Sequence, residues 1–447
     1  MFLMHKTKKL EKVKSPAHAG NRRLEPSNLG ELTMSGRMKK QQLYYLFFAN
    51  FAILFVGMGV FPILPLYAIE FGAKPSFIGI YLAITYLSIT IGSMLTGYLS
   101  SKFGIKSLFI GSGIAGIPVL VLMGYVQSLW QVVFLTSIIW FVGGIGVGLA
   151  GVFTGYYAEK KDRGKSFSFQ SLSSPVSAII GGAIVGYILE VYSYQAMFIV
   201  SAIIWTIWPA LGLWKIQYMA PVPQITPGKA KLEKKESLSK SFILILAITL
   251  LAALTVNASR LGLSISMESL NFSAAEVSST TVAGGIASIP AILLIGSLTD
   301  RFGRSKSIAL GLLLTVAGSI ILVFATQLWH FWTASAFLLV SLATNGSVTS
   351  ALITDMLPAS ELKNKLPLTN TMRYIASIIS FGGAGYVLEM LGPDFLYGAA
   401  AVLPIAAVLL TIRLNTTNQG SLPGQQAVPK KARQTTMVSQ EQPVPCQ

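Results

Sequence analysis

The stretch Gly296-Ser297-Leu298-Thr299-Asp300-Arg301-Phe302-Gly303-Arg304-Ser305-Lys306 places one acidic and three basic side chains between two long apolar runs. A related stretch, Gly97-Tyr98-Leu99-Ser100-Ser101-Lys102-Phe103-Gly104-Ile105-Lys106, occurs 199 residues earlier. The glycines of the two copies keep this offset. A polar turn that recurs halfway along an apolar chain indicates a membrane protein built by internal duplication.

A second pair of matching segments has the same offset of 199 residues. The first segment contains Ile179, Ile180, Gly186, Tyr187, Leu189 and Glu190, and the second contains Ile378, Ile379, Gly385, Tyr386, Leu388 and Glu389. Two motifs at one offset predict that the two halves of the chain share one architecture.

The composition places the chain in a lipid bilayer. Of its 447 residues, 53% are hydrophobic and only 11% are charged, and the mean hydropathy is +0.63. Soluble domains carry about 25% charged residues. The net charge of +17 does not indicate a nucleic-acid partner, because the basic residues lie in loops and tails rather than along one helix face.

The sequence also argues against metal, cofactor and enzyme chemistry. The single cysteine, Cys446, allows no intrachain disulfide, and the three histidines lack metal-ligand spacing. Nucleotide-binding and hydrolase motifs such as G-x-x-x-x-G-K-[ST] and G-x-S-x-G do not occur. We therefore expect no metal site, no cofactor and no enzymatic activity.

Twelve apolar runs are long enough to cross a bilayer. They lie at about 43–67, 76–98, 107–126, 129–156, 166–190, 195–216, 241–266, 275–298, 307–326, 330–355, 367–390 and 395–413. The fifth and eighth runs open with serine-rich and threonine-rich segments, which are expected to face a cavity or a partner helix. The fold class is therefore an all-α membrane protein with twelve transmembrane helices in two pseudo-symmetric six-helix bundles.

These runs predict five regions. Residues 1–42 form a basic, disordered cytosolic tail, residues 43–216 the first bundle, residues 217–240 a cytosolic linker, residues 241–413 the second bundle, and residues 414–447 a disordered cytosolic tail. Of the 34 Lys and Arg residues, 31 fall in the tails and alternate loops, and only Lys74 falls in the opposite loops. The positive-inside rule therefore places both termini in the cytosol.

The six-plus-six arrangement and the G-x-x-x-D-x-x-G-R loop resemble the major facilitator superfamily over about residues 43–413. The run Pro62-Ile63-Leu64-Pro65-Leu66-Tyr67 is similar to the drug:proton antiporter branch. The resemblance implies a monomeric secondary transporter of the bacterial cytoplasmic membrane, whose partners are a small-molecule substrate, membrane lipids and protons.

In that family the repeated loop is a conformational latch. The resemblance gives this role to Gly97, Gly104, Lys106, Gly296, Asp300, Arg301, Gly303 and Arg304. A carboxylate at Asp300 is favoured near a helix N-terminus, the arginines supply forked donors, and Gly303 permits a tight turn. The alternative is that the bases serve only as topology signals. Ser101 replaces the aspartate in the first copy, which predicts a weaker latch there.

Two departures from the antiporter pattern weaken the inference of proton antiport. Trp140 stands where the branch carries an arginine in the fourth span, and the glycines after Pro175 lie too far along the chain for the antiporter motif. Neither departure affects the predicted fold.

Charged side chains inside a bilayer are functional candidates, because burying a charge is costly. Arg260, near the outer end of the seventh span, either extends to the membrane surface, pairs with Glu268 or binds an anionic group. Arg373 and Asp355 are candidates for an inner gate pair, and Glu70 is a further candidate for gating or coupling. No Asp, Glu or His lies in the middle of any span.

Uncharged polar residues complete the candidate substrate site. With Arg260, it comprises Asn50, Trp140, Gln170, Asn257 and Asn345. The amides either line a central cavity or tie helices together, and Trp140 either forms a flat apolar wall or packs in the core. The function predicted is efflux of small, partly apolar compounds, driven by the proton gradient. The alternatives are transport of an anionic or sugar-like solute and a membrane sensor that does not transport.

Overall fold

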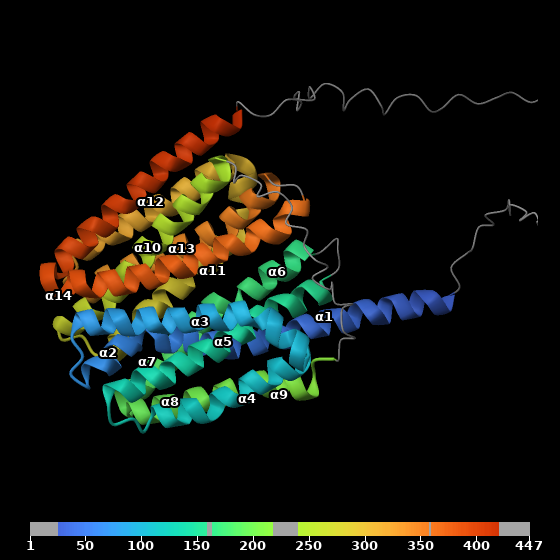
Figure 1. The fold of residues 1–447 in the computed structure, drawn as a ribbon, viewed down its shortest axis with the longest axis horizontal. Coiled ribbons are helices and arrows are strands. Elements are labelled where there is room, and N and C mark those ends of the chain that lie inside the picture. The colour runs from blue at the N-terminus through green and yellow to red at the C-terminus, as the bar shows by residue number, and fades with distance from the viewer. Residues whose placement is uncertain (1–25, 159–162, 218–239, 357–358, 420–447) are drawn as a thin grey trace, which may run out of the picture.

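The computed structural model describes residues 26–158, 163–217, 240–356 and 359–419 (Figure 1). Every secondary-structure element in these ranges is helical. The helices of the first half, blue to green in Figure 1, pack as one bundle, and those of the second half, yellow to red, pack as another. Helices satisfy their backbone hydrogen bonds internally, which an apolar environment requires.

The first bundle begins with a long, locally unwound segment that comprises α1 (Pro26–Leu54), the π-helix η1 (Phe55–Val60), the 3-10 helix η2 (Phe61–Ile63) and α2 (Leu64–Ile69). Its other helices are α3 (Pro75–Phe103), α4 (Ile105–Met123), α5 (Leu129–Tyr157), α6 (Arg163–Ser171), α7 (Ser173–Val191), α8 (Tyr194–Trp205) and α9 (Ile207–Trp214). The second bundle contains α10 (Lys240–Ser269), α11 (Ala274–Phe302), α12 (Arg304–Val323), α13 (Leu328–Met356) and α14 (Ala359–Gln419).

The structure confirms twelve membrane crossings. Within the described ranges, eleven helices are long and apolar enough to span a membrane, and the last of them, Leu368–Arg413, has 46 residues. A single crossing needs only about 20 residues. Gly392 breaks this helix with a φ of 81°, so two helices meet there.

Large apolar side chains are exposed on both bundles, among them Met94, Phe134 and Val402. Such side chains lie on the outside of a membrane protein because they contact the acyl chains of the bilayer. The fold is therefore the predicted all-α membrane architecture.

The first helix begins within the region that the sequence predicts as a tail. The tail expected over residues 1–42 is helical from Pro26 onward, where α1 begins. Proline suits the first position of a helix, and the following residues include strong helix formers such as Leu29, Leu32 and Met34. Residues 1–25, the predicted linker over 218–239 and the tail from 420 lie outside the described residues.

The repeated loops form the same turn in both halves. Gly104 separates α3 from α4 with a φ of 82°, and Gly303 separates α11 from α12 with a φ of 88°. An L-amino acid with a side chain rarely adopts this conformation, so glycine is needed at both positions. The turn predicted at Gly303 is confirmed.

Candidate substrate cavity

A cavity of about 740 Å³ lies between the two bundles. The first bundle contributes residues of η1, α5, α6 and α7, and the second contributes residues of α11, α13 and α14. Its apolar lining includes Met58, Phe167 and Leu339, and its polar lining includes Ser168, Ser171, Ser174, Ser288, Ser347 and Ser350. A cavity of this size accommodates a drug-sized molecule.

The polar starts of the fifth and eighth spans lie where the sequence predicted. Ser168, Ser171 and Ser174 line the cavity. At the start of α11, the buried Ser278 hydroxyl donates a hydrogen bond to the Gly182 carbonyl on α7 at 2.8 Å. One segment therefore faces the cavity and the other a partner helix, which removes both from the lipid.

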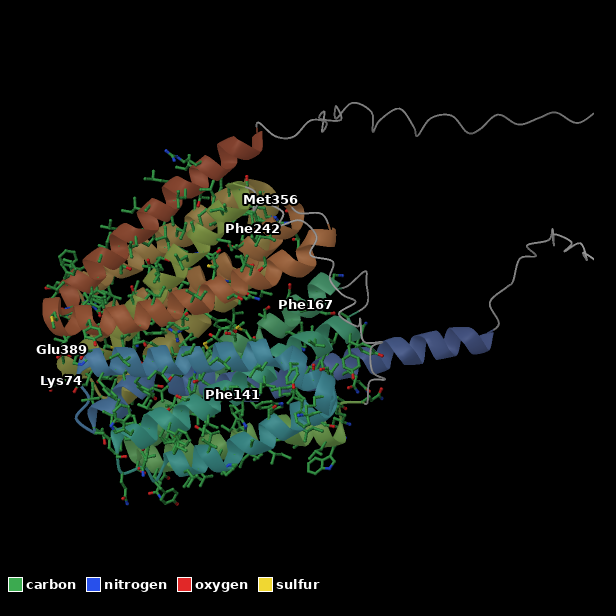
Figure 2. The ribbon with its side chains drawn as sticks, viewed as in Figure 1. Lys74, Phe141, Phe167, Phe242, Met356 and Glu389 are labelled. Carbon is green, nitrogen blue, oxygen red and sulfur yellow. The ribbon has the colours of Figure 1, made fainter. Side chains whose placement is uncertain are left out.

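The cavity opens toward one end of the molecule. Figure 2 places Phe167 and Met356 toward the end at which α1 begins, and Lys74 and Glu389 at the opposite end. Phe167 and Ser347, which line the cavity, are exposed. We call the end near Phe167 the open end and the end near Glu389 the closed end.

The first contact that shuts the closed end joins α3 to α14. A Cβ atom on Gly79 would lie 2.8 Å from the Cα atom of Gly385, and a Cβ atom on Gly385 would lie 2.8 Å from the Cα atom of Gly79. Only glycine allows two helices to approach so closely. One turn beyond, a carboxylate oxygen of Glu389 accepts a hydrogen bond from the Ser76 backbone N–H at 3.0 Å.

The bond from Ser76 to Glu389 caps a helix of the other bundle. Because α3 begins at Pro75, the Ser76 N–H has no partner within its own helix. A carboxylate is favourable at this position, since the N-terminus of a helix carries partial positive charge. The two bundles are thereby joined by a polar contact as well as by glycine packing.

The second contact at the closed end joins α7 to α11. The Ser278 hydroxyl bonds to Gly182, and a Cβ atom on Gly182 would lie 3.0 Å from the Ser278 carbonyl oxygen. One turn along, a Cβ atom on Gly186 would lie 3.4 Å from the Ala275 carbonyl oxygen. Small residues in the repeated segment around Gly186 and Gly385 thus form both contacts.

Arg260 points into the protein rather than toward the membrane surface. Its guanidinium carbon lies 4.6 Å from the centre of the Phe61 ring, and it interacts with the hydroxyl of Tyr86. Phe61 also packs against two other rings: its ring centre lies 6.4 Å from that of Trp140 and 5.7 Å from that of Phe381. In the described part of the chain no ion pair joins Arg260 to Glu268, so the predicted pairing of these two residues is wrong for this conformation.

Arg373 and Asp355 are not paired in this structure. Arg373 lines the cavity and donates a hydrogen bond from Nη2 to the Gly346 carbonyl at 3.0 Å. Asp355 instead accepts from Nε of Arg304 at 2.9 Å. The expected inner gate pair is therefore separated, because the latch arginine occupies the carboxylate.

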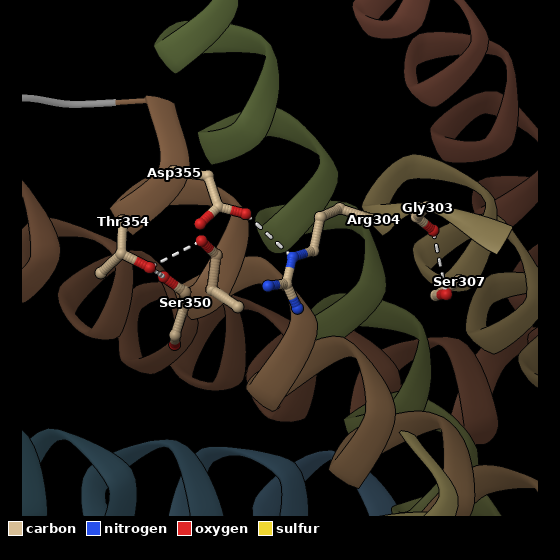
Figure 3. Close-up of polar contacts among 7 residues, drawn as sticks. Gly303, Arg304, Ser307, Ser350, Thr354 and Asp355 are labelled. Carbon is tan, nitrogen blue, oxygen red and sulfur yellow. Dashed lines mark hydrogen bonds and ion pairs between the residues drawn. The ribbon is translucent and has the colours of Figure 1, made fainter. Parts of the chain in front are cut away.

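Figure 3 shows the Arg304–Asp355 contact in the second latch. It joins the first residue of α12 to the end of α13, and the Ser307 hydroxyl donates to the Gly303 carbonyl beside it. Gly296 lies within α11, the side chain of Asp300 is outside the described part of the structure, and Arg301 is exposed. In the first latch, the Ser101 hydroxyl donates to the Tyr98 carbonyl of its own helix.

The remaining residues of the first latch show no comparable ion pair within the described ranges. Gly97 has open space around it, Gly104 forms the turn, and Lys106 is half-buried in the first turn of α4. This asymmetry follows from Ile105 and Tyr156, which stand at the positions of Arg304 and Asp355 in the first half and carry no charge.

Most of the predicted substrate-binding amides tie helices together. Asn50 donates to the Ser173 hydroxyl at 2.6 Å, and Gln170 donates to the Leu43 carbonyl at 2.8 Å. Asn257 donates to the Ser377 hydroxyl at 2.8 Å, which joins α10 to α14. None of these three lines the large cavity. Trp140 is buried against Phe61.

Asn345 and Glu70 have different surroundings. Asn345 borders a small cavity of about 30 Å³ within the second bundle, and Arg373 lines both this cavity and the large one. Glu70 is exposed at the end of α2, on the closed side of the molecule. The structure thus brings Asn345 and Arg373 to one cavity wall and leaves Glu70 at the rim.

Two helical bundles that enclose a shared cavity, open at one end and shut at the other, define a multi-pass membrane transporter. The chain belongs to the Major Facilitator Superfamily, whose sequence profile matches residues 46–264 and 245–444.

The similar proteins include drug-resistance proteins. The chain is 29% identical over 171 residues to "Multidrug resistance protein MdtG" of Proteus mirabilis (strain HI4320), a match that covers 36% of this chain and less than half, 42%, of that protein. It is 29% identical over 300 residues to "Quinolone resistance protein NorA" of Staphylococcus aureus (strain MSSA476), covering 65% of this chain and 75% of that protein.

A solved structure shares the fold. The nucleoside transporter NupG superimposes with a TM-score of 0.70 at 12% sequence identity, covering 84% of this chain and 99% of that one. At this identity the likeness concerns the fold alone.

Sequence reasoning did not identify the contacts at the closed end. The repeat around Gly385 and Glu389 was visible, but nothing in the sequence specifies that these residues meet Gly79 and Ser76. The sequence feature that could have indicated these contacts is a glycine followed one turn later by a carboxylate near the end of a span, as in Gly385 and Glu389.

Proposed function

We propose that this protein exports small, partly apolar compounds across the bacterial cytoplasmic membrane by alternating access. The observation that carries the proposal is the cavity of about 740 Å³ between the bundles, which is open at one end and shut at the other. Rocking of one bundle against the other would open the α3–α14 and α7–α11 contacts and expose the same cavity on the opposite side.

The charge distribution supports the orientation we propose. Described basic residues lie at the open end, among them Arg304, which bonds to Asp355 beside Met356, so the positive-inside rule assigns the open end to the cytosol. The described conformation is then inward-facing, with both termini in the cytosol. We propose that the protein acts as a monomer, since one chain supplies both bundles and the whole cavity wall.

The names of the drug-resistance relatives support efflux of drug-like compounds, and the mixed apolar and hydroxyl lining suits such cargo. We further propose that the proton gradient drives export. Among the described residues, the lining of the cavity contains no Asp or Glu. Coupling is therefore assigned to carboxylates near the helix ends, with Asp355, Glu70 and Glu389 as candidates.

The test is accumulation of cationic, neutral and anionic fluorescent compounds in cells with and without the protein, before and after an uncoupler. At least one compound should accumulate less in the presence of the protein, and the uncoupler should abolish the difference. Flux in liposomes that contain the purified protein would exclude a sensor that only binds. No difference for any compound, together with no flux in liposomes, would overturn the proposal.

A further inference from the structure

The only charge that the described residues place on the wall of the large cavity is positive. Arg373 is the only ionisable side chain among the described residues that line the large cavity, and it lines the small cavity as well. The carboxylate of Asp355, the expected partner of Arg373, is instead bonded to Arg304 at 2.9 Å. A ligand in the cavity therefore meets a positive group and no described negative one.

The guanidinium of Arg373 is positioned by a neighbouring glycine. Its Nη2 donates to the Gly346 carbonyl at 3.0 Å, and a Cβ atom on residue 346 would lie 3.6 Å from Nη1. A guanidinium has five N–H donors, and the structure shows one of them bonded. The remaining donors match the geometry of a carboxylate, which an arginine binds through two parallel hydrogen bonds.

A second arginine lies farther toward the closed end. Phe61 follows Met58, a cavity residue, by about one turn of the same segment. The guanidinium carbon of Arg260 lies 4.6 Å from the centre of the Phe61 ring. No carboxylate is shown paired with Arg260 in the described ranges. Both arginines therefore raise the positive potential along the path between the bundles, which disfavours cations.

The rest of the lining suits the body of an organic molecule. Phe167, Leu339 and Leu342 supply apolar surface, and Ser347 and Ser350 supply hydroxyls near Arg373. These two hydroxyls donate to carbonyls of their own helix, and a hydroxyl can rotate to bond a ligand.

We propose that the cavity selects organic anions with an apolar body, and that Arg373 binds the anionic group. This inference rests on the proposed transport function, because the bound anion is taken to be the cargo.

The test is calorimetric titration of the purified full-length protein in detergent with three matched probes: 2-naphthoate, 2-naphthamide and 2-naphthylmethylammonium. The carboxylate should bind roughly 10- to 100-fold more tightly than the amide, because a hydrogen bond to a charged group contributes that much. The ammonium compound should bind no better than the amide. Absent binding of the carboxylate, or equal binding of all three, overturns the inference.

Variants locate the effect. Arg373→Gln should remove the preference for the carboxylate and leave the affinity for the amide unchanged, which also shows that the variant is folded. Arg373→Lys should retain part of the preference, since lysine keeps the charge without the fork. Lys215→Gln, which removes an exposed charge at the end of α9, should change nothing. A preference that survives Arg373→Gln would overturn the assignment.

The same probes separate this inference from the proposed function. Export of a cationic dye without binding of the carboxylate would refute anion selection and leave export intact. Binding of the carboxylate at Arg373 without flux of any compound would refute export and leave the anion site.

Discussion

Gly79 of α3 and Gly385 of α14 approach so closely that a Cβ atom on either would lie 2.8 Å from the Cα atom of the other. The two residues belong to different bundles, so their contact holds the bundles together at the closed end. Their separation is the change that alternating access requires.

Gly385→Ala should shift the protein away from the described conformation. Overpacking of this kind costs about 1–3 kcal/mol, so the ratio of the two conformations should change roughly 5- to 150-fold. The measurement is maleimide labelling of Ser347→Cys in everted vesicles, in a Cys446→Ser background that removes the single native cysteine. Labelling should fall, because Ser347 lines the cavity at the open end.

Gly383→Ala is the matched control, since a Cβ atom at Gly383 would meet nothing within 4 Å. It should leave labelling unchanged. Equal labelling of the two variants would show that the Gly79–Gly385 contact does not govern the conformation.

Glu389→Ala should open the closed end less strongly than Gly385→Ala. It removes the carboxylate that caps α3 at Ser76 but leaves the helix packing intact. The same labelling experiment should show a smaller decrease relative to the unmutated protein. In high salt the difference between the two proteins should be smaller still, because salt already screens the exposed contact in the unmutated protein. Glu190→Ala changes the repeat-related glutamate, which is exposed on α7, and should have no effect.

The Arg304–Asp355 pair should contribute little to stability. Its side chains are 32% and 55% exposed, so solvent screens their attraction. A double-mutant cycle of Arg304→Gln and Asp355→Asn, followed by denaturant unfolding in detergent, should give a coupling energy of about 0.2–1 kcal/mol. If the variants lose transport while their free energy of unfolding changes little, the pair acts in the conformational cycle. Lys306→Gln, an exposed base in the same loop, serves as the control.

Asn257→Ala should lower stability without changing substrate affinity. The Asn257 side chain joins α10 to α14 through Ser377, and such interhelical hydrogen bonds contribute about 0.6–1.7 kcal/mol. Thermal unfolding in detergent measures the effect, and Ser377→Ala should reproduce it. Unchanged unfolding with weaker substrate binding would instead place Asn257 in the substrate site.

Most of the fold could be predicted from the sequence because the bilayer limits the options. Long apolar runs must be helices, and the repeat at an offset of 199 residues specifies two equivalent halves. The glycine turns at Gly104 and Gly303 follow from the same repeat. The start of α1 at Pro26 is less evident from the sequence, because basic residues and helix formers are mixed there.

The site was less predictable, because a side chain's role depends on which helix it faces. In the sequence, four amides look equivalent because all are polar groups in apolar runs: Asn50, Gln170, Asn257 and Asn345. In the structure, the first three bond to neighbouring helices, whereas Asn345 borders a cavity. The sequence suggested Arg373 as the partner of Asp355, and only the structure shows that Arg304 bonds to it. Pairing across bundles is a property of tertiary packing and leaves no periodic pattern.

The two contacts at the closed end use equivalent positions of the repeat, one around Gly385 and one around Gly186. Each bundle behaves as a packed unit, so α3 cannot leave α14 while α7 remains against α11 unless a helix bends. The two contacts must therefore break in a single cooperative step. If the bundles rock as proposed, a membrane that maintains an ion gradient benefits, because simultaneous separation avoids a half-opened form through which water and ions would leak.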